Sequence, residues 1–146
     1  MSLHDAELVR AFWGQWNADG WTRGAWTRGE VDLSLFDPEV VYEDNNLPDH
    51  IGETYRGHQG VVRAAERWTE PFEWIAVGVE RIVDLGDELV SSHRWRARFR
   101  HTELEINERL VYRWRVRDGK IVYFRSLNGL EADEAERVAD EAQGVE

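Results

Sequence analysis

The 146-residue sequence contains no cysteine, so the chain can form neither a disulfide framework nor a thiolate metal site. A reducing compartment is therefore the simpler expectation. Nowhere do about eighteen apolar residues occur together, as a membrane-spanning helix would require. The N-terminus also lacks a basic region followed by an apolar run. These absences predict a soluble, cytoplasmic protein that does not associate with a membrane.

Signals for metal, phosphate and nucleic-acid binding are also missing. The five histidines show neither the H-x-H nor the H-x-x-x-H spacing of common metal sites. Neither G-x-G-x-x-G nor the P-loop pattern occurs. Lys and Arg number 18 against 29 Asp and Glu, a formal net charge of −11, which argues against general binding to phosphate backbones. We expect no metal, no cofactor and no nucleic-acid partner.

The composition is that of a folded globule. Hydrophobic residues make up 42% and charged residues 32% of the chain, and tryptophan occurs eight times. This apolar and aromatic content is enough for a buried core and unlike that of a disordered tail. The length predicts a single domain, residues 1–146.

One hairpin, Glu105 to Asn128, gives the clearest structural signal. Its first arm alternates apolar residues at even positions with polar ones at odd positions, which predicts a strand with one buried face. Asp118-Gly119 predicts a two-residue turn. Tyr112 lies on the apolar face, and so does Glu108, a carboxylate that is costly to bury unless it is paired or functional.

Helical spacing of apolar residues predicts two helices in the first half of the chain. One starts near Asp5 as N-cap and ends near Asn17 to Gly20; the other follows G-H-Q-G at 57–60 and ends before Pro71. Between these helices, the segment with two W-T-R-G copies at 21–29 is expected to be a loop or a short helical turn. It should be followed by a short helix at Glu30–Phe36, a brief strand from Val40 to Tyr42 and a loop from Leu47 to Tyr55.

The sequence pattern in the second half of the chain predicts several strands followed by one helix. We expect a strand from Phe72 to Val83, a turn at Leu85–Glu88, a strand from Leu89 to His101, the hairpin, and an acidic helix from Leu130 to Ala142. Early helices followed by antiparallel strands predict an α+β fold in which a sheet curls over the N-terminal helices. Such a sheet leaves a concave space suited to a pocket.

Two regions of opposite charge are conspicuous. One face of the predicted sheet carries seven arginines: Arg94, Arg96, Arg98, Arg100, Arg109, Arg113 and Arg115. The stretch from Glu131 to Glu146 holds seven acids against Arg137 alone. Either both regions are solvated, or they meet across a dimer interface.

Four segments, F-D-P-E-V-V-Y-E-D, Y-R-G-H-Q-G-V-V-R, D-L-G-D-E-L-V and Y-R-W-R-V-R-D-G-K-I-V-Y-F, follow one another over nearly the whole chain. Their order and spacing resemble the SnoaL-like branch of the nuclear transport factor 2-like superfamily. Its members include polyketide cyclases, ketosteroid isomerases, dehydratases and epoxide hydrolases, and also proteins that only bind or assemble. The resemblance implies a cone-shaped α+β fold with a strongly curved, mainly antiparallel sheet, an apolar cavity and homodimerisation through the sheet.

Candidate catalytic residues follow from the resemblance. The general base of ketosteroid isomerases is an Asp in a V-E-D context similar to Tyr42-Glu43-Asp44, which implies Asp44 as the base. A second acid of those enzymes corresponds to Tyr112, whose phenol can donate to a developing oxyanion. Their first-helix tyrosine corresponds to Phe12, which cannot donate. The acid of the epoxide hydrolase branch falls near Ser126, which cannot replace it.

Inward-facing side chains complete the predicted site. His93 shares the inward face of its strand and would assist Tyr112. The residues expected to contact a substrate are Phe12, Trp16, Tyr42, Trp68, Trp95, Glu108, Trp114 and Phe124. So many aromatic rings favour a small, flat, apolar or aromatic ligand.

Two functional hypotheses follow. The first is a cofactor-independent isomerase, cyclase or dehydratase that acts on a small apolar carbonyl compound, with Asp44 as base and Tyr112 and His93 stabilising the enolate. The second is a non-catalytic binding or assembly module whose cavity is filled by its own tryptophans. Whether Asp44, His93 and Tyr112 converge on an open space discriminates between them.

Overall fold

The computed structural model describes residues 3–14, 32–45 and 53–144. This part of the chain forms three α-helices, a short 3-10 helix and six strands. They are, in order, α1 (Leu3–Gly14), η1 (Leu33–Leu35), β1 (Phe36–Asp44), β2 (Glu53–Arg56), α3 (Gly57–Thr69), β3 (Phe72–Asp84), β4 (Leu89–Phe99), β5 (Glu105–Arg117), β6 (Lys120–Leu127) and α4 (Gly129–Ala142).

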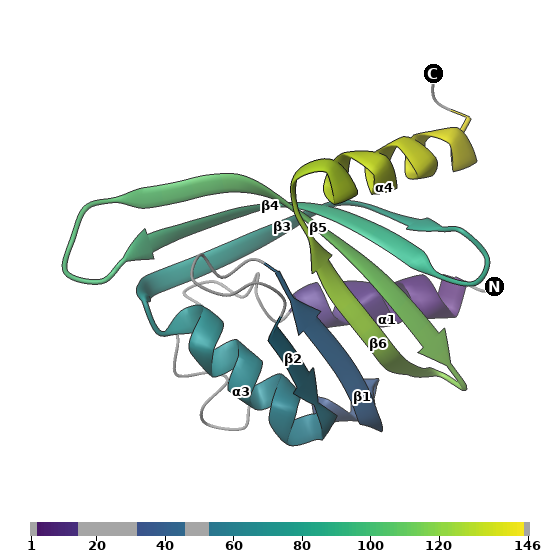
Figure 1. Ribbon diagram of the computed structural model, residues 1–146, viewed down its shortest axis with the longest axis horizontal. Helices are drawn as coiled ribbons and strands as arrows, with labels where there is room; N and C mark the ends of the chain where they lie inside the picture. Colours follow the sequence, from purple (N-terminus) through teal and green to yellow (C-terminus); the bar gives the residue numbers. More distant parts are fainter. Residues whose placement is uncertain (1–2, 15–31, 46–52, 145–146) are drawn as a thin grey trace.

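The six strands make one sheet in the order β2-β1-β6-β5-β4-β3. All neighbours are antiparallel except β1 and β6, which are parallel. The register shifts within β3, between Val79 and Arg81, and within β5, between Arg115 and Val116. Such irregularities bend a strand and increase its twist, and the sheet in Figure 1 is strongly curved. The predicted α+β fold with a curved, mainly antiparallel sheet is confirmed.

The hairpin of β5 and β6 forms as its alternation predicts. Leu110, Tyr112 and Trp114 are buried, whereas Arg109 and Arg115 are exposed. The loop between the strands consists of Asp118 and Gly119, with φ of 52° and 76°. Two consecutive positive φ values are typical of the tight turns whose twist matches a hairpin.

The region before the hairpin differs from the prediction in three ways. The helix expected at Glu30–Phe36 is limited, in the described residues, to η1, and β1 begins at Phe36, before Pro38. Pro38 fits inside the strand because the register with β6 shifts between Phe36 and Val41. The expected loop ends in β2, which pairs with β1. The first helix begins at Leu3, so Asp5 lies in its first turn rather than at its N-cap.

The inner face of the sheet packs against α1 and α3, which lie together on one side of it in Figure 1. Phe12 of α1 meets Phe36, Trp114 and Phe124, with ring centroids 5.7, 5.5 and 5.9 Å away. On α3, a Cβ at Gly60 would lie 3.0 Å from the carbonyl carbon of Tyr55. Glycine therefore allows α3 to approach β2 closely.

The outer face of the sheet is covered in its middle by α4, which lies on the opposite side from α1 in Figure 1. A second, smaller core forms there from Val83, Val90, Val111, Leu127, Ala132, Ala135 and Ala139. Around it, arginines of the sheet pair with acids of α4. Of the seven arginines predicted on one face, Arg109 pairs with Asp133 and Glu136 of α4, whereas Arg98 and Arg113 pair with Glu105 and Glu88. The acidic helix thus meets part of the arginine face within one chain, an arrangement that neither sequence-based alternative included.

Glu108 is the clearest error in the expected burial pattern. It pairs with Trp95 across β4 and β5, and Trp95 is 7% exposed. Glu108 itself is exposed, in the first third of β5 where Glu105 and Asn107 are exposed too, whereas Trp95 packs against Trp68 and Phe72. The prediction that its carboxylate is buried is wrong. None of the helices among the described residues is both long and apolar enough to cross a bilayer.

Candidate functional site

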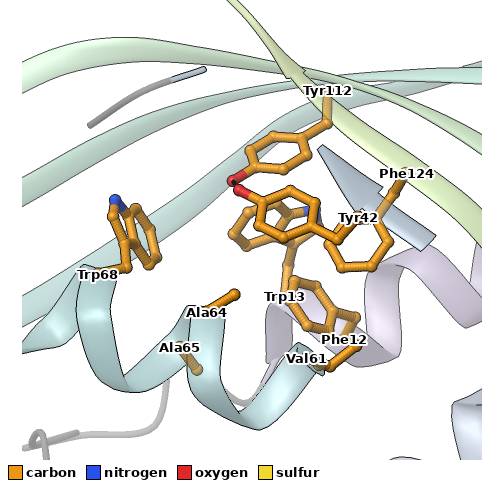
Figure 2. Close-up of a pocket in the computed structure, with 9 residues that line it drawn as sticks. All are labelled: Phe12, Trp13, Tyr42, Val61, Ala64, Ala65, Trp68, Tyr112 and Phe124. Atoms are coloured by element: carbon orange, nitrogen blue, oxygen red, sulfur yellow. Dashed lines mark hydrogen bonds between the residues drawn. The ribbon is translucent and has the colours of Figure 1, made fainter. Parts of the chain in front are cut away.

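A narrow pocket lies between α3 and the inner face of the sheet. It is lined by Phe12, Trp13, Tyr42, Val61, Ala64, Ala65, Trp68, Tyr112 and Phe124. Its free volume is about 20 Å³, which is room for about one water molecule. Figure 2 shows the hydroxyl groups of Tyr42 and Tyr112 meeting above Ala64, with Trp68 facing them across the gap. Aromatic side chains therefore occupy most of the space that the curved sheet encloses.

The polar centre of the pocket is a pair of phenols. Tyr42 Oη and Tyr112 Oη form a buried 2.9 Å hydrogen bond, in which either can be the donor. Burial, followed by the nearby Tyr112 and Asp44, raises the pKa of Tyr42 well above its usual value. Tyr42 is thus a neutral phenol at physiological pH. A neutral phenol can donate a hydrogen bond to a ligand oxygen.

Trp13 fills the space beside this pair. Its ring centroid lies 5.0 Å from that of Tyr112 and 4.3 Å from that of His93, and its side chain is 1% exposed. His93 does not line the pocket, whereas Trp13 does. Two residues of the lining, Trp13 and Tyr112, therefore contact His93, with ring centroids 4.3 and 6.0 Å away.

His93 is held as a neutral imidazole. It is 0% exposed, and its Nδ1 lies 2.9 Å from the carbonyl oxygen of Leu110. A carbonyl oxygen can only accept, so Nδ1 carries the proton and Nε2 presents a lone pair. Burial lowers the pKa of His93 to about 3, against a smaller opposing effect of the Leu110 hydrogen bond. His93 can accept a proton or hydrogen bond at Nε2, but it carries no charge at neutral pH.

Asp44 is buried at 1% exposure, at the end of β1. The Ser126 hydroxyl lies 3.5 Å from Asp44 Oδ1, and the backbone N–H of Asn45 donates to the same hydroxyl over 2.7 Å. Tyr42, two residues before Asp44, lines the pocket, whereas Asp44 does not. The carboxylate is thus near enough to raise the pKa of Tyr42 without forming part of the pocket lining.

The predicted site residues are not all brought together. Asp44 and His93 are buried but do not line the pocket. Tyr112, Phe12, Tyr42, Trp68 and Phe124 line the pocket. Trp95 and Trp114 belong to the core and Glu108 to the surface. Trp16 lies outside the described residues.

Four pocket residues were not among the predicted ligand contacts: Trp13, Val61, Ala64 and Ala65. Val61, Ala64, Ala65 and Trp68 share one face of α3 at helical spacing, and all four are buried. That amphipathic face was the signal for Val61, Ala64 and Ala65, whereas Trp13 belongs to α1. It was overlooked because alanine contributes little surface of its own.

Proteins of known structure share this fold at low sequence identity. A Catenulispora acidiphila protein with a ketosteroid isomerase-like fold, in complex with trimethylamine, is 18% identical, has a TM-score of 0.66, and matches over 96% of this chain and 94% of its own. A putative SnoaL-like polyketide cyclase from Jannaschia is 20% identical over 90% of both chains, with a TM-score of 0.63. A Mycobacterium tuberculosis protein in complex with estradiol-17β-hemisuccinate is 18% identical, with a TM-score of 0.66 over 88% of this chain and 96% of that one.

These likenesses establish the fold alone, and no curated protein matches the sequence. The family is established by the sequence itself, because the model of the SnoaL-like domain matches residues 9–124. The matched region runs from α1 to β6 and contains every described residue that lines the pocket. The chain belongs to the SnoaL-like domain family.

Proposed function

We propose that this protein binds a small, flat, neutral molecule in the pocket between α3 and the sheet, with an oxygen of the ligand hydrogen-bonded to the Tyr42–Tyr112 pair. The observation that carries the proposal is this pair of buried hydroxyls, 2.9 Å apart, in a pocket whose other lining side chains are apolar or indole rings. A buried hydrogen-bonding group in an apolar pocket favours ligands with one matching polar atom.

The chemistry of the lining limits the ligand class. No Asp, Glu, Lys or Arg lines the pocket among the described residues, so a charged ligand would lose its hydration without compensation. Either phenol can act as the donor, so a carbonyl or phenol oxygen can be accommodated. Several similar folds contain bound small molecules, including trimethylamine and estradiol-17β-hemisuccinate, which supports ligand binding as a use of this architecture.

The free volume of about 20 Å³ means that a ligand must displace part of the aromatic lining. Trp13 is the side chain to move, because it lines the pocket and packs against both His93 and Tyr112, with ring centroids 4.3 and 5.0 Å away. Movement of Trp13 would bring His93 Nε2 into the enlarged space as a second hydrogen-bond acceptor. We therefore propose that Trp13 is displaced when a ligand binds.

Tryptophan fluorescence tests this proposal directly, because Trp13 and Trp68 both line the pocket. A panel of phenols, steroids and aromatic polyketide fragments is titrated into wild type, Tyr42→Phe and Tyr123→Phe. Tyr123 is a matched control, since its hydroxyl also bonds to another side chain, Glu43, but lies outside the pocket lining. We expect saturable quenching that weakens about 5- to 30-fold in Tyr42→Phe, the equivalent of one hydrogen bond, and is unchanged in Tyr123→Phe. Absence of quenching by every ligand, or equal affinities in the three proteins, would refute it.

A second candidate function is proton transfer on a bound carbonyl compound, with Asp44 as the base. The near-complete burial of Asp44 and its position beside Tyr42 favour it, because buried carboxylates adjacent to a phenol donor suit enolisation. Deuterium incorporation from D₂O into a ligand that binds should then occur in wild type and in Glu39→Gln, an exposed substitution on β1, and be lost in Asp44→Asn. Binding without any exchange would leave the binding function and exclude this one.

A further inference from the structure

Ser126 lies where Asp44 and the phenol pair meet. On the inner face of the sheet, Ser126 pairs with Tyr112 across β5 and β6. Phe124, two residues before it, pairs with Tyr42 across β1 and β6. Ser126 is 0% exposed, so its hydrogen bonds are made with protein groups, as is usual for buried hydroxyls.

The hydrogen bonds of Ser126 Oγ extend in two directions. The backbone N–H of Asn45 donates to it over 2.7 Å, and Ser126 Oγ donates to Asp44 Oδ1 over 3.5 Å. The pKa of Tyr42 is raised chiefly by burial and by the nearby Tyr112, whereas a hydrogen bond with the Ser126 side chain acts in the opposite direction. Tyr42 is itself bonded to Tyr112. A chain of polar groups thus runs from the buried carboxylate through Ser126 to the phenol pair in the pocket.

The direction of one hydrogen bond in this chain fixes the direction of the next, because each hydroxyl has a single proton. A carboxylate can only accept, and Ser126 donates to Asp44. The Ser126 oxygen then accepts from Tyr42, and Tyr42 accepts from Tyr112. The Tyr112 proton is thereby directed into the chain, so the Tyr112 oxygen meets a ligand as an acceptor.

A proton on Asp44 reverses these bonds. The carboxylic acid has an O–H that can donate to Ser126, and Ser126 then donates to Tyr42. Tyr42 in turn donates to Tyr112, since either phenol can be the donor in their 2.9 Å bond. The Tyr112 hydroxyl then meets the ligand as a donor. The charge of Asp44 therefore decides whether the pocket accepts or donates a hydrogen bond.

Other titratable groups surround Asp44 without belonging to the chain. Glu53 pairs with it across β1 and β2 and forms an ion pair with Arg67 of α3. Tyr55 of β2 is close to all three charges, but burial has the largest effect and raises its pKa to about 12. Tyr55 is therefore neutral, and Arg67 compensates the charge of Glu53. Of these side chains, all within the described residues, Asp44 is the one that bonds to Ser126.

We propose that Asp44 sets the hydrogen-bonding direction of the pocket through Ser126, so that the pocket binds a hydroxyl compound, such as a phenol, as long as Asp44 is a carboxylate. Ser126 is a positioning residue, because it does not line the pocket and acts through the phenol pair. The inference rests on the proposed binding function and narrows its ligand class. It also separates the two candidate functions, because proton transfer to an Asp44 carboxylate requires a bound carbonyl compound.

The test compares two ligands of similar size, 4-ethylphenol as the donor and acetophenone as the acceptor, by equilibrium dialysis at neutral pH. The ratio of their affinities is measured, because a general loosening of the pocket weakens both. We expect wild type to bind 4-ethylphenol more tightly. Asp44→Asn, whose amide is neutral and can donate, should shift the ratio about 5- to 30-fold towards acetophenone. Glu43→Gln is the matched control, since this carboxylate is one residue away but bonds to Tyr123, and it should leave the ratio unchanged.

Substitution of Ser126 tests the connection itself. Ser126→Ala breaks the chain, so adding Asp44→Asn to it should change the ratio by less than about twofold. Ser126→Cys, which keeps the side-chain volume but is a weak donor, should give the same result and covers the case in which alanine impairs folding. Three results would overturn the inference and leave the binding function intact: tighter binding of acetophenone by wild type, no shift in Asp44→Asn, or an equal shift with and without the Ser126 hydroxyl. Binding of neither ligand to wild type would refute the binding function, and this inference with it.

Discussion

Tyr42 Oη lies 2.9 Å from Tyr112 Oη, although the residues are 70 positions apart in the chain. The strands that carry them are not neighbours, because β6 lies between β1 and β5. Phe124 of β6 fills the interval, with its ring centroid 4.3 Å from that of Tyr42. The hydroxyl pair thus bridges over a phenylalanine, and its formation depends on the curvature of the sheet.

This hydrogen bond predicts that substitutions of Tyr42 and Tyr112 have coupled effects on the free energy of unfolding. Tyr42→Phe should lower the free energy of unfolding by about 1–3 kcal/mol, because it leaves the buried Tyr112 hydroxyl without this bond. The double variant Tyr42→Phe/Tyr112→Phe should cost less than the sum of the two single variants. Denaturant unfolding of the four proteins measures the coupling. Additive losses would show that the two hydroxyls do not stabilise each other.

The burial of His93 predicts that the free energy of unfolding depends on pH. The unfolded chain binds a proton at this side chain near pH 6.5, whereas burial lowers the folded pKa to about 3. Between these two pKa values the unfolded state binds more protons than the folded state. The free energy of unfolding is therefore highest above pH 6.5 and decreases by about 1.4 kcal/mol for each unit by which the pH is lowered. His93→Gln should remove this part of the slope between pH 6.5 and 4. Parallel stability curves for the two proteins would contradict the assignment.

Ser91 is predicted to stabilise the core through one hydrogen bond. Trp114 Nε1 donates to Ser91 Oγ over 2.7 Å, and both residues are 0% exposed. Ser91→Ala should therefore cost about 1–3 kcal/mol, because a buried indole N–H loses its acceptor. The same substitution in a Trp114→Phe background should cost much less. Thermal unfolding compares the two backgrounds, and an equal loss in both would place the effect of Ser91 elsewhere.

Ala64 is predicted to set the size of ligand that the pocket admits. Figure 2 shows it directly opposite the paired hydroxyls, and the free volume of about 20 Å³ cannot take three further carbon atoms. Ala64→Leu should abolish ligand quenching and lower stability by about 1–3 kcal/mol through overpacking. Ala76→Leu, an exposed site on β3, is the control and should change neither. Ligand binding that survives in Ala64→Leu would move the binding site away from α3.

The sequence predicted the fold where local rules suffice. Alternation identified the inward face of β5, including Tyr112, and Asp118-Gly119 specified the turn after it. It did not predict that Val111, on the other face, would be buried, because alternation assumes one solvated face and α4 covers this one. Nor did it reveal β2, since four residues within a loop-like segment carry too little periodicity.

The candidate site was only partly predictable for a different reason. The resemblance pointed to Asp44 and strand alternation to His93 as inward-facing groups, and both are buried. Whether a buried group reaches the pocket depends on which side chain stands in front of it. Tyr42 lines the pocket and Asp44 does not, and Trp13 lines it whereas His93 does not. Such layering arises from the packing of α1 and β1 on the sheet, which no spacing within one segment encodes.

The position of β6 between β1 and β5 determines the order in which the protein is assembled during synthesis. β3, β4 and β5 are joined by short turns and pair with their neighbours in sequence, so they form early. β1 is made before them, yet its link to these strands is β6, the last strand to leave the ribosome. Asn45 reaches its partner Ser126 across 81 positions. The two phenols can therefore meet only after β6 has been translated, and a nascent chain that stops before β6 carries Tyr42 and Tyr112 but lacks Phe124 of the pocket lining.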